Sequence, residues 1–222
     1  MRELADGVRM LRGFPPNAIN VFLLDDVLID AATKFAGRRI LGQIKGHALS
    51  AHALTHAHPD HQGVSAKVCT ERGVPLWVGK GDVQAMESPG GIRAAQPAVP
   101  LNRVIDTLWT GPAHPVDRAL VEGDAVGSFE VLDVPGHSTG HVAYWRERDR
   151  VLVCGDVLNN MNLITSLPGL HEPPRIFTPD PARNRESARR LGELRPALAL
   201  FGHGPPLRDP GKFADFCAAL PA

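Results

Sequence analysis

The stretch Thr55-His56-Ala57-His58-Pro59-Asp60-His61 constrains this chain more than any other part of its sequence. It places three histidines and one aspartate within seven positions, directly after an apolar segment. Imidazole and carboxylate groups are preferred ligands of zinc, and they also bind iron and manganese. Four such residues so close together indicate a metal site rather than ordinary surface or core histidines.

The local geometry of this stretch predicts two groups of ligands. A strand is expected over residues 49–55, and alternate residues of an extended chain point to the same side, so His56 and His58 can reach one ion. The proline that follows cannot donate to a strand ladder and is expected to end the strand. Asp60 and His61 then begin a predicted helix and are turned toward a second ion.

Further ligands are expected from three later segments, in each of which an apolar run leads to a glycine and then to a polar residue. These segments are Val134-Pro-Gly-His137, Val151-Leu-Val-Cys-Gly-Asp156 and Leu198-Ala-Leu-Phe-Gly-His203. A strand that ends this way places a polar group at the edge of a sheet, where loops carry function. Two ions need about three protein ligands each plus a shared group, and these three residues would complete such a set.

The order of the motifs, His-x-His-x-Asp-His, Gly-His, Gly-Asp and Gly-His-Gly, resembles that of the metallo-β-lactamase superfamily. The resemblance extends from Asn20 to about Pro206. It implies an α/β fold, a four-layer αββα sandwich, with the metals at one edge where the two sheets meet. Because no repeat, low-complexity tract or linker interrupts the sequence, residues 1–222 are expected to form a single domain of this fold.

The resemblance also implies a role for each candidate ligand around two divalent ions. Zinc is the expected ion, and iron and manganese are alternatives. The implied ligands are His56, His58 and His137 for one ion, Asp60, His61 and His203 for the other, and Asp156 as the bridge between them. Asp60 is also the expected catalytic residue, because its carboxylate can orient the attacking water or move its proton.

Two more residues are expected to support the ligands without binding metal. The resemblance places Asp30 behind the imidazoles, where a carboxylate orients the rings and raises their basicity. His141, four residues after His137, is expected to have a supporting or structural role. Most relatives follow the aspartate with a small residue and a glycine, whereas this chain has Ala31-Ala32, so the backbone there is expected to avoid positive φ.

The rest of the chain alternates between strand and helix patterns, as expected of a layered α/β fold. Strands are predicted at 8–11, 18–24, 27–30, 49–55, 75–78, 129–134, 141–146, 151–154 and 197–201, and helices at 34–45, 60–69, 82–86, 101–108, 180–194 and 210–220. The insert at 157–179 has little regular pattern but many apolar residues, so it is expected to be a lid, a pocket wall or a dimer face. Trp109 and Met86 are expected to pack in the core.

Composition limits the partners and the compartment. Lys and Arg number 24 and Asp and Glu number 24, and this zero net charge argues against nucleic acid or an anionic membrane surface as the main partner. No apolar run reaches the roughly 18 residues of a membrane span, and the charged segment Met1–Gly13 lacks the apolar core of a signal peptide. The 3 cysteines lack paired spacing and indicate reduced thiols. A cytoplasmic protein that acts on a small molecule is expected, and the oligomeric state stays open.

Hydrolysis of a carboxylic ester, thioester or lactone is the reaction that the motifs favour. The motif form is similar to that of glyoxalase II and of the acyl-homoserine lactonases. Glyoxalase II has a further C-terminal helical region that grips glutathione, whereas this chain ends soon after His203. The lactonases place a tyrosine over the metals, whereas the only tyrosine here, Tyr144, is expected in the core. The substrate therefore stays unassigned.

Other classes of function fit the sequence less well. It has no Gly-x-Ser-x-Gly elbow and no glycine-rich phosphate loop with lysine, and a β-lactamase would be expected to carry an export signal. Persulfide dioxygenases share the motif order but use one iron held by two histidines and an aspartate, which would be His56, His137 and Asp156 here. This oxidoreductase is the alternative function. A metal-stabilised binding module is disfavoured because all seven ligand positions are filled.

Overall fold

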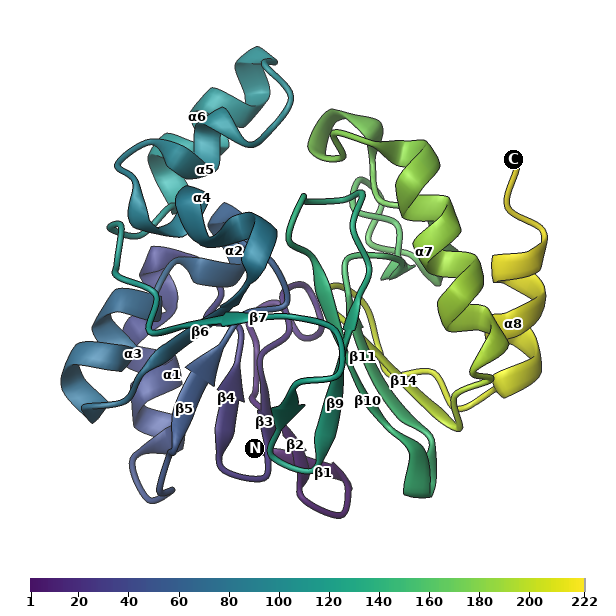
Figure 1. Cartoon of the computed structure of the whole chain (residues 1–222), viewed down its shortest axis with the longest axis horizontal. Helices are drawn as coiled ribbons and strands as arrows, with labels where there is room; N and C mark the ends of the chain where they lie inside the picture. Colours follow the sequence, from purple (N-terminus) through teal and green to yellow (C-terminus); the bar gives the residue numbers. More distant parts are fainter. Residues whose placement is uncertain (222) are drawn as a thin grey trace.

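Short apolar strands build a first sheet of seven strands in the computed structural model, which describes residues 1–221 (Figure 1). The strand order follows the sequence. The strands are β1 (Arg2–Ala5), β2 (Val8–Met10), β3 (Phe22–Leu24), β4 (Val27–Ile29), β5 (Ala51–Ala53), β6 (Leu76–Gly79) and β7 (Arg118–Leu120). Strands β1 to β4 pair antiparallel, and β4 to β7 run parallel. The carboxyl ends of β4, β5 and β6 therefore lie at the same edge of this sheet.

A second sheet contains five strands in the order β14-β11-β10-β9-β8. The strands are β8 (Ala125–Val126), β9 (Phe129–Asp133), β10 (Val142–Arg146), β11 (Val151–Gly155) and β14 (Leu198–Phe201). Only β11 and β14 pair in parallel within it, so their carboxyl ends also meet at one edge.

Four layers result from the packing of the two sheets and their helices (Figure 1). The inner faces of both sheets share one buried core, to which Phe22, Ile29, Tyr144 and Val153 contribute. Helices α1 (Gly37–Ile44) and α3 (Ser65–Arg72) cover the outer face of the first sheet, and α7 (Pro181–Glu193) and α8 (Pro210–Ala218) cover that of the second. The expected α/β fold, an αββα sandwich, is confirmed.

The helix expected at 60–69 is interrupted. It forms as α2 (Pro59–Gln62) followed by α3, because Gly63 packs against the backbone of residues 32–34. Gly63 N donates a hydrogen bond of 2.7 Å to Ala32 O, and a Cβ at this position would lie 2.6 Å from the same oxygen. Because of this break, α3 takes a different direction from α2 and lies along the outer face of the first sheet.

Several further helical elements connect the strands. They are the 3-10 turns η1 (Lys34–Ala36), η2 (Lys80–Asp82), η3 (Glu147–Asp149) and η4 (Arg175–Phe177), and the helices α4 (Val83–Glu87), α5 (Gly91–Ala94) and α6 (Pro100–Trp109). The insert at 157–179 contains a two-stranded sheet of β12 (Asn159–Met161) and β13 (Pro168–His171), which the sequence pattern did not predict. Two strands of three and four residues are too short to show a clear alternation of apolar and polar residues.

The backbone after β4 adopts the positive φ that the sequence was expected to avoid. Asp30 has φ 61° and Ala32 has φ 51°. Aspartate tolerates this left-handed conformation, whereas at alanine it costs about 1 kcal/mol. Hydrogen bonds fix the turn, since Asp30 N donates to Ala53 O at 2.9 Å and Ala31 N donates to His61 O at 2.6 Å. The expectation was wrong because these contacts come from distant segments of the chain.

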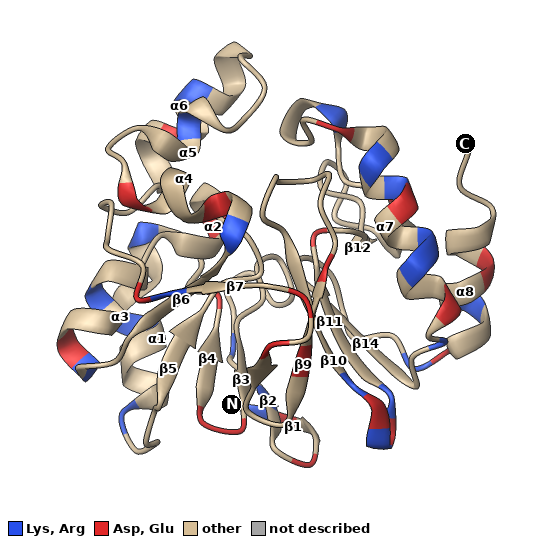
Figure 2. Cartoon of the chain, in the orientation of Figure 1, with Lys and Arg blue, Asp and Glu red and all other residues tan. Residues whose placement is uncertain are grey.

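Charges of both signs are interspersed on the outer helices α3, α7 and α8 (Figure 2). This distribution agrees with the zero net charge of the chain. None of the helices in the part of the chain that the structure describes has the length and apolar character needed to cross a bilayer.

His52 on β5 is expected to make stability depend on pH. Its buried ring lies 3.0 Å from Leu28 O and 2.8 Å from Ser65 Oγ. Burial lowers the pKa of His52 from 6.5 to about 4. The unfolded chain therefore binds a proton at a higher pH than the folded chain does, and stability is lost as pH falls from 6.5 toward 4.

Replacing His52 with glutamine removes this titration, so the metal-free variant should lose about 2–3 kcal/mol less stability than the metal-free parent between pH 7.5 and 4.5. Denaturant unfolding of both proteins at the two pH values measures the difference. Equal losses in the two proteins would show that His52 does not titrate in this way.

Candidate metal centre

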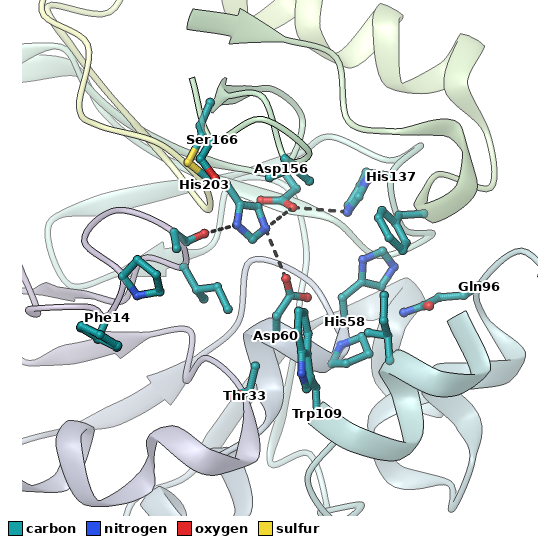
Figure 3. A pocket seen from close by; sticks show the side chains of 18 residues that line it. Phe14, Thr33, His58, Asp60, Gln96, Trp109, His137, Asp156, Ser166 and His203 are labelled. Atoms are coloured by element: carbon teal, nitrogen blue, oxygen red, sulfur yellow. Dashed lines mark hydrogen bonds and ion pairs between the residues drawn. The ribbon is translucent and has the colours of Figure 1, made fainter. Parts of the chain in front are cut away.

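Seven polar side chains meet at the edge where the two sheets adjoin, and those that line the adjacent cavity are labelled in Figure 3. They come from the segment that follows β5, from the β9–β10 loop and from the residues that follow β11 and β14. The side chains are His56, His58, Asp60, His61, His137, Asp156 and His203. The carboxyl ends of parallel strands place them together, as in other open α/β sheets.

The first group consists of His56, His58 and His137. One ring nitrogen from each lies within 4.8 Å of the others, and all three side chains are buried. Burial and the neighbouring imidazoles hold the pKa of His56 and of His137 well below its ordinary value. These two rings are therefore neutral at pH 7, which is the form of imidazole that binds a metal.

The second group consists of Asp60, His61 and His203, again with one ligand atom from each within 4.8 Å of the others. His203 Nε2 lies 3.3 Å from Asp60 Oδ2. Burial favours the neutral acid, but the hydrogen bond from His203 and the charge of His61 keep the pKa of Asp60 below its ordinary value. The carboxylate of this group is thus anionic. Protonated imidazoles balance its charge in the absence of metal, and a bound cation could balance it in their place.

Asp156 lies between the two groups. Its Oδ1 is 3.6 Å from His61 Nε2, and its Oδ2 is 3.7 Å from His137 Nε2 and 3.1 Å from His203 Nε2. Burial opposes ionisation, but His203 and His61 outweigh it and hold the pKa of Asp156 well below its ordinary value. One carboxylate therefore faces ligand atoms of both groups.

Unpartnered polar atoms test whether this site fits a metal. Within residues 1–221, the buried atoms at the centre that have no hydrogen-bond partner are Nε2 of His56, His58, His61 and His137 and Oδ1 of Asp156. A buried polar atom without a partner costs roughly 1–3 kcal/mol, so five in one cluster call for a ligand. Four nitrogens and a carboxylate oxygen form a donor set typical of zinc, iron or manganese.

Asp30 lies behind two of these imidazoles. Its Oδ2 accepts hydrogen bonds from His61 Nδ1 at 2.9 Å and from Thr55 Oγ1 at 2.8 Å, and Thr55 Oγ1 lies 3.0 Å from His56 Nδ1. The oxygen at each Nδ1 selects the tautomer that leaves Nε2 free to face the centre. Asp30 therefore has the contacts of a residue that orients ligands.

His141 packs beside the centre and contributes no atom to either group. Its ring stacks on that of His56 with centroids 4.6 Å apart, and its Nε2 accepts a hydrogen bond of 3.0 Å from Asp156 N. Burial lowers the pKa of His141 to about 3, so the ring is neutral and can act as an acceptor. It thus fixes the backbone of Asp156 and the plane of His56.

Asp82 joins the two loops that carry the first group, a role that sequence analysis missed. Its Oδ2 accepts hydrogen bonds from Ala57 N at 2.9 Å and Ser138 Oγ at 2.6 Å, and its Oδ1 accepts one from Gly140 N at 2.7 Å. A weaker form of the signal was present, because Gly81-Asp82 follows the end of β6 at Gly79 after one intervening residue, whereas β11 leads directly to Gly155-Asp156.

Substituting Asp82 with asparagine is expected to weaken metal binding at the first group by about 10–100-fold. The amide presents its own N–H to one of three donors, which loosens the loops that hold His58 and His137. Asp117→Asn is the matched control, since Asp117 Oδ2 accepts from Leu76 N at the far end of the same strand. Chelator competition measures both affinities, and an Asp82→Asn affinity equal to that of the control would contradict the proposed role.

A cavity of about 510 Å³ opens onto the centre (Figure 3). Trp109 from α6 lines it, contrary to the expectation that this side chain packs in the core, whereas Met86 is buried in the core as expected. The helix has one apolar face, formed by residues 101, 104, 105, 108 and 109, and such a face normally packs inward. Here the polar residues Asn102 and Asp106 are buried instead, so the apolar face is left to the cavity and the surface. Met161, Leu163 and Phe177 also line the cavity, so the insert at 157–179 forms part of its wall.

Comparison with known proteins relates this chain to a family of metal-dependent proteins. The profile of the metallo-beta-lactamase superfamily matches residues 14–203. The probable metallo-hydrolase YflN of Bacillus subtilis is 30% identical over 203 residues, which cover 82% of this chain and 76% of that protein. A hydroxyacylglutathione hydrolase of Rhodospirillum rubrum is 32% identical over 67% of this chain, but the match spans only 46% of that enzyme.

A solved structure agrees with these sequence relatives. The structure of TTHA1623 in a di-iron-bound form is 28% identical, covers 96% of each chain and superposes with a TM-score of 0.63. The fold, the order of the motifs and the sequence profile therefore indicate the same family. This chain belongs to the metallo-beta-lactamase superfamily.

Proposed function

We propose that the chain is a binuclear metal-dependent hydrolase that cleaves a carboxylic ester, thioester or lactone. The cluster of five unpartnered buried ligand atoms is the observation that carries this proposal. The donors fall into two groups of three, and Asp156 forms a third group with one histidine of each, His56 and His61, which suits two adjacent ions rather than one. The related TTHA1623 holds two irons in its solved structure, which supports the same stoichiometry.

The proposed ligands follow the two groups. They are His56, His58 and His137 for one ion, Asp60, His61 and His203 for the other, and Asp156 for both. When bound, two divalent ions would supply a water of lowered pKa, near about 7, and Lewis acidity toward the carbonyl. Zinc is the proposed ion, with iron and manganese as alternatives.

The chain's own residues would supply orientation and charge. Asp60 lines the cavity beside His203. With one carboxylate oxygen on a bound ion, the other could accept a hydrogen bond from the attacking water. Because coordination would keep this carboxylate anionic, its main role would be to orient the water. Asp60 and Asp156 together contribute two negative charges, which leaves a pair of divalent ions with net positive charge for an oxyanion.

The matched pair His61→Ala and His47→Ala tests the proposal. His61 carries a ligand atom of the second group, whereas the side chain of His47 is half-buried after α1 and belongs to neither group. His61→Ala should reduce turnover of an ester, thioester and lactone panel at least about 1,000-fold, as expected when the activation of water is lost. Turnover that survives His61→Ala at the level of the control would refute a binuclear hydrolase.

The alternative, an iron-dependent dioxygenase, would use His56, His137 and Asp156. It accounts for fewer of the observations, because His61 and His203 converge on the same carboxylate at comparable distances. Oxygen uptake by iron-loaded protein with a glutathione persulfide would identify this activity.

A further inference from the structure

The cavity that opens onto the metal centre is walled mainly by apolar side chains. They include Ile19, Ile105, Trp109, Met161, Leu163 and Phe177, contributed by four separate segments of the chain. Trp109 and Ser166 lie on opposite sides of Asp60 and His203 (Figure 3). A ligand bound at the centre would therefore lie against apolar surface contributed by α6 and the 162–167 loop.

The polar groups of the wall outside the metal centre carry no charge. They are Thr33, Gln96 and Ser166. No lysine or arginine within residues 1–221 lines the cavity. Lys34, next to Thr33, is exposed and donates a hydrogen bond from its Nζ to Thr107 O at 2.9 Å. A carboxylate on the ligand would have no cation to pair with in this wall, and an unpaired charge is costly to bury.

Apolar residues continue from the cavity onto the surface. Leu101 stands four residues before Ile105 and eight before Trp109, so the three share one line along α6, and Leu101 is 48% exposed. On the insert, Ile164 is 91% and Leu167 65% exposed, next to the lining residue Leu163. Apolar surface that continues out of a pocket typically marks a binding site.

We infer that the site takes an ester, thioester or lactone whose chain beyond the carbonyl is an uncharged hydrocarbon, and that this chain lies along α6 and the 162–167 loop. The inference rests on the proposed hydrolase function and adds the class of substrate. Glutathione thioesters would be poor substrates, because the two carboxylates of their thiol part would also meet a wall without lysine or arginine. The continuity of the exposed apolar residues with the cavity assigns them to the substrate's chain rather than to another protein.

A paired series of esters tests the substrate class. The para-nitrophenyl esters of butanoate, hexanoate and octanoate are compared with the half-ester of octanedioate, which has the same length but ends in a carboxylate. kcat/KM should rise about fourfold per methylene along the neutral series. The half-ester should be at least about 100-fold poorer than octanoate. A half-ester as good as octanoate, or a flat series, would overturn the inference.

Charge variants of the chain test the location. Leu163→Arg places a cation in the wall and should raise kcat/KM for the half-ester about tenfold while lowering that for octanoate. Val121→Arg is the control, since Val121 is exposed and does not line the cavity. Arg175→Ala should leave the ratio of the two esters unchanged, because its exposed guanidinium lies outside the wall. A ratio that responds to Arg175→Ala, or does not respond to Leu163→Arg, would place the substrate elsewhere.

Ligand binding separates this inference from the proposed reaction. Calorimetry compares 2-decanone with 9-oxodecanoate, which differ by a terminal carboxylate and need no hydrolysis. Tighter binding of the neutral ketone, with no ester turned over, would refute the hydrolase and retain the apolar site. Tighter or equal binding of the keto acid refutes the apolar site.

The oligomeric state tests the role of the exposed apolar residues. If the protein is a dimer that Ile164→Glu dissociates, and the variant keeps the same chain-length series, these residues form a contact between copies. That result would overturn their assignment to the substrate.

Discussion

Replacing Asp156 with asparagine is expected to lower hydrolytic turnover at least about 1,000-fold and to reduce the number of bound ions. Its carboxylate is the group that faces ligand atoms of both proposed ions, with His61 Nε2 on one oxygen and His137 and His203 Nε2 on the other. The amide keeps the shape of the side chain, removes its charge and leaves one oxygen in place of two. The fold should therefore persist while the bridge between the two groups is lost.

The comparison for this variant is Asp215→Asn, a change of the same kind on the exposed surface of α8. Metal content and kcat/KM are measured on both proteins, with circular dichroism to confirm folding. An Asp156→Asn protein that keeps two ions per chain and turnover within tenfold of the parent would show that this carboxylate does not bridge.

Substituting Gly202 with alanine is expected to disrupt the centre although Gly202 offers no ligand. A Cβ at this position would overlap Asp156 Oδ1 and would lie 2.6 Å from His61 Cε1. Its backbone is fixed on both sides, because Gly202 N donates to Gly155 O at 2.9 Å and Gly202 O accepts from Asn20 N at 2.8 Å. The carboxylate has to move, so loss of metal and a fall in turnover of at least about 100-fold are expected.

Gly42→Ala on α1 is the matched control, because a Cβ there would meet no atom within 4 Å. This control should raise stability by up to about 1 kcal/mol, since alanine is the better helix former, and should leave metal content unchanged. Normal metal content in Gly202→Ala would mean that the carboxylate can shift at little cost, against the packing described above.

Sequence alone indicates which side chains gather at the sheet edge because the signal is local. An apolar strand followed by glycine and a histidine or aspartate predicts both the side chain and its place, and the structure brings His137, Asp156 and His203 together there. Their role as metal ligands stays a prediction. The layered fold follows from the same alternation of strands and helices.

Features that depend on distant contacts could not be predicted in this way. Asp82 matters because β6 happens to lie beside the β9–β10 loop, and the positive φ of Ala32 is imposed by contacts with α2 and Gly63. Trp109 lines the cavity because of how α6 is placed, which its sequence does not specify. In each case the residue could lie either in the core or at the site as far as its sequence context shows, and tertiary packing decides between the two places.

Metal content is the measurement that tests the binuclear centre most directly. Plasma mass spectrometry on protein purified without added metal should find about two ions per chain, as expected from two groups of three ligands with one bridge. Chelation should remove the ions and the hydrolytic activity together, and zinc should restore both. One iron per chain together with oxygen uptake, or no metal after gentle purification, would contradict a binuclear hydrolase.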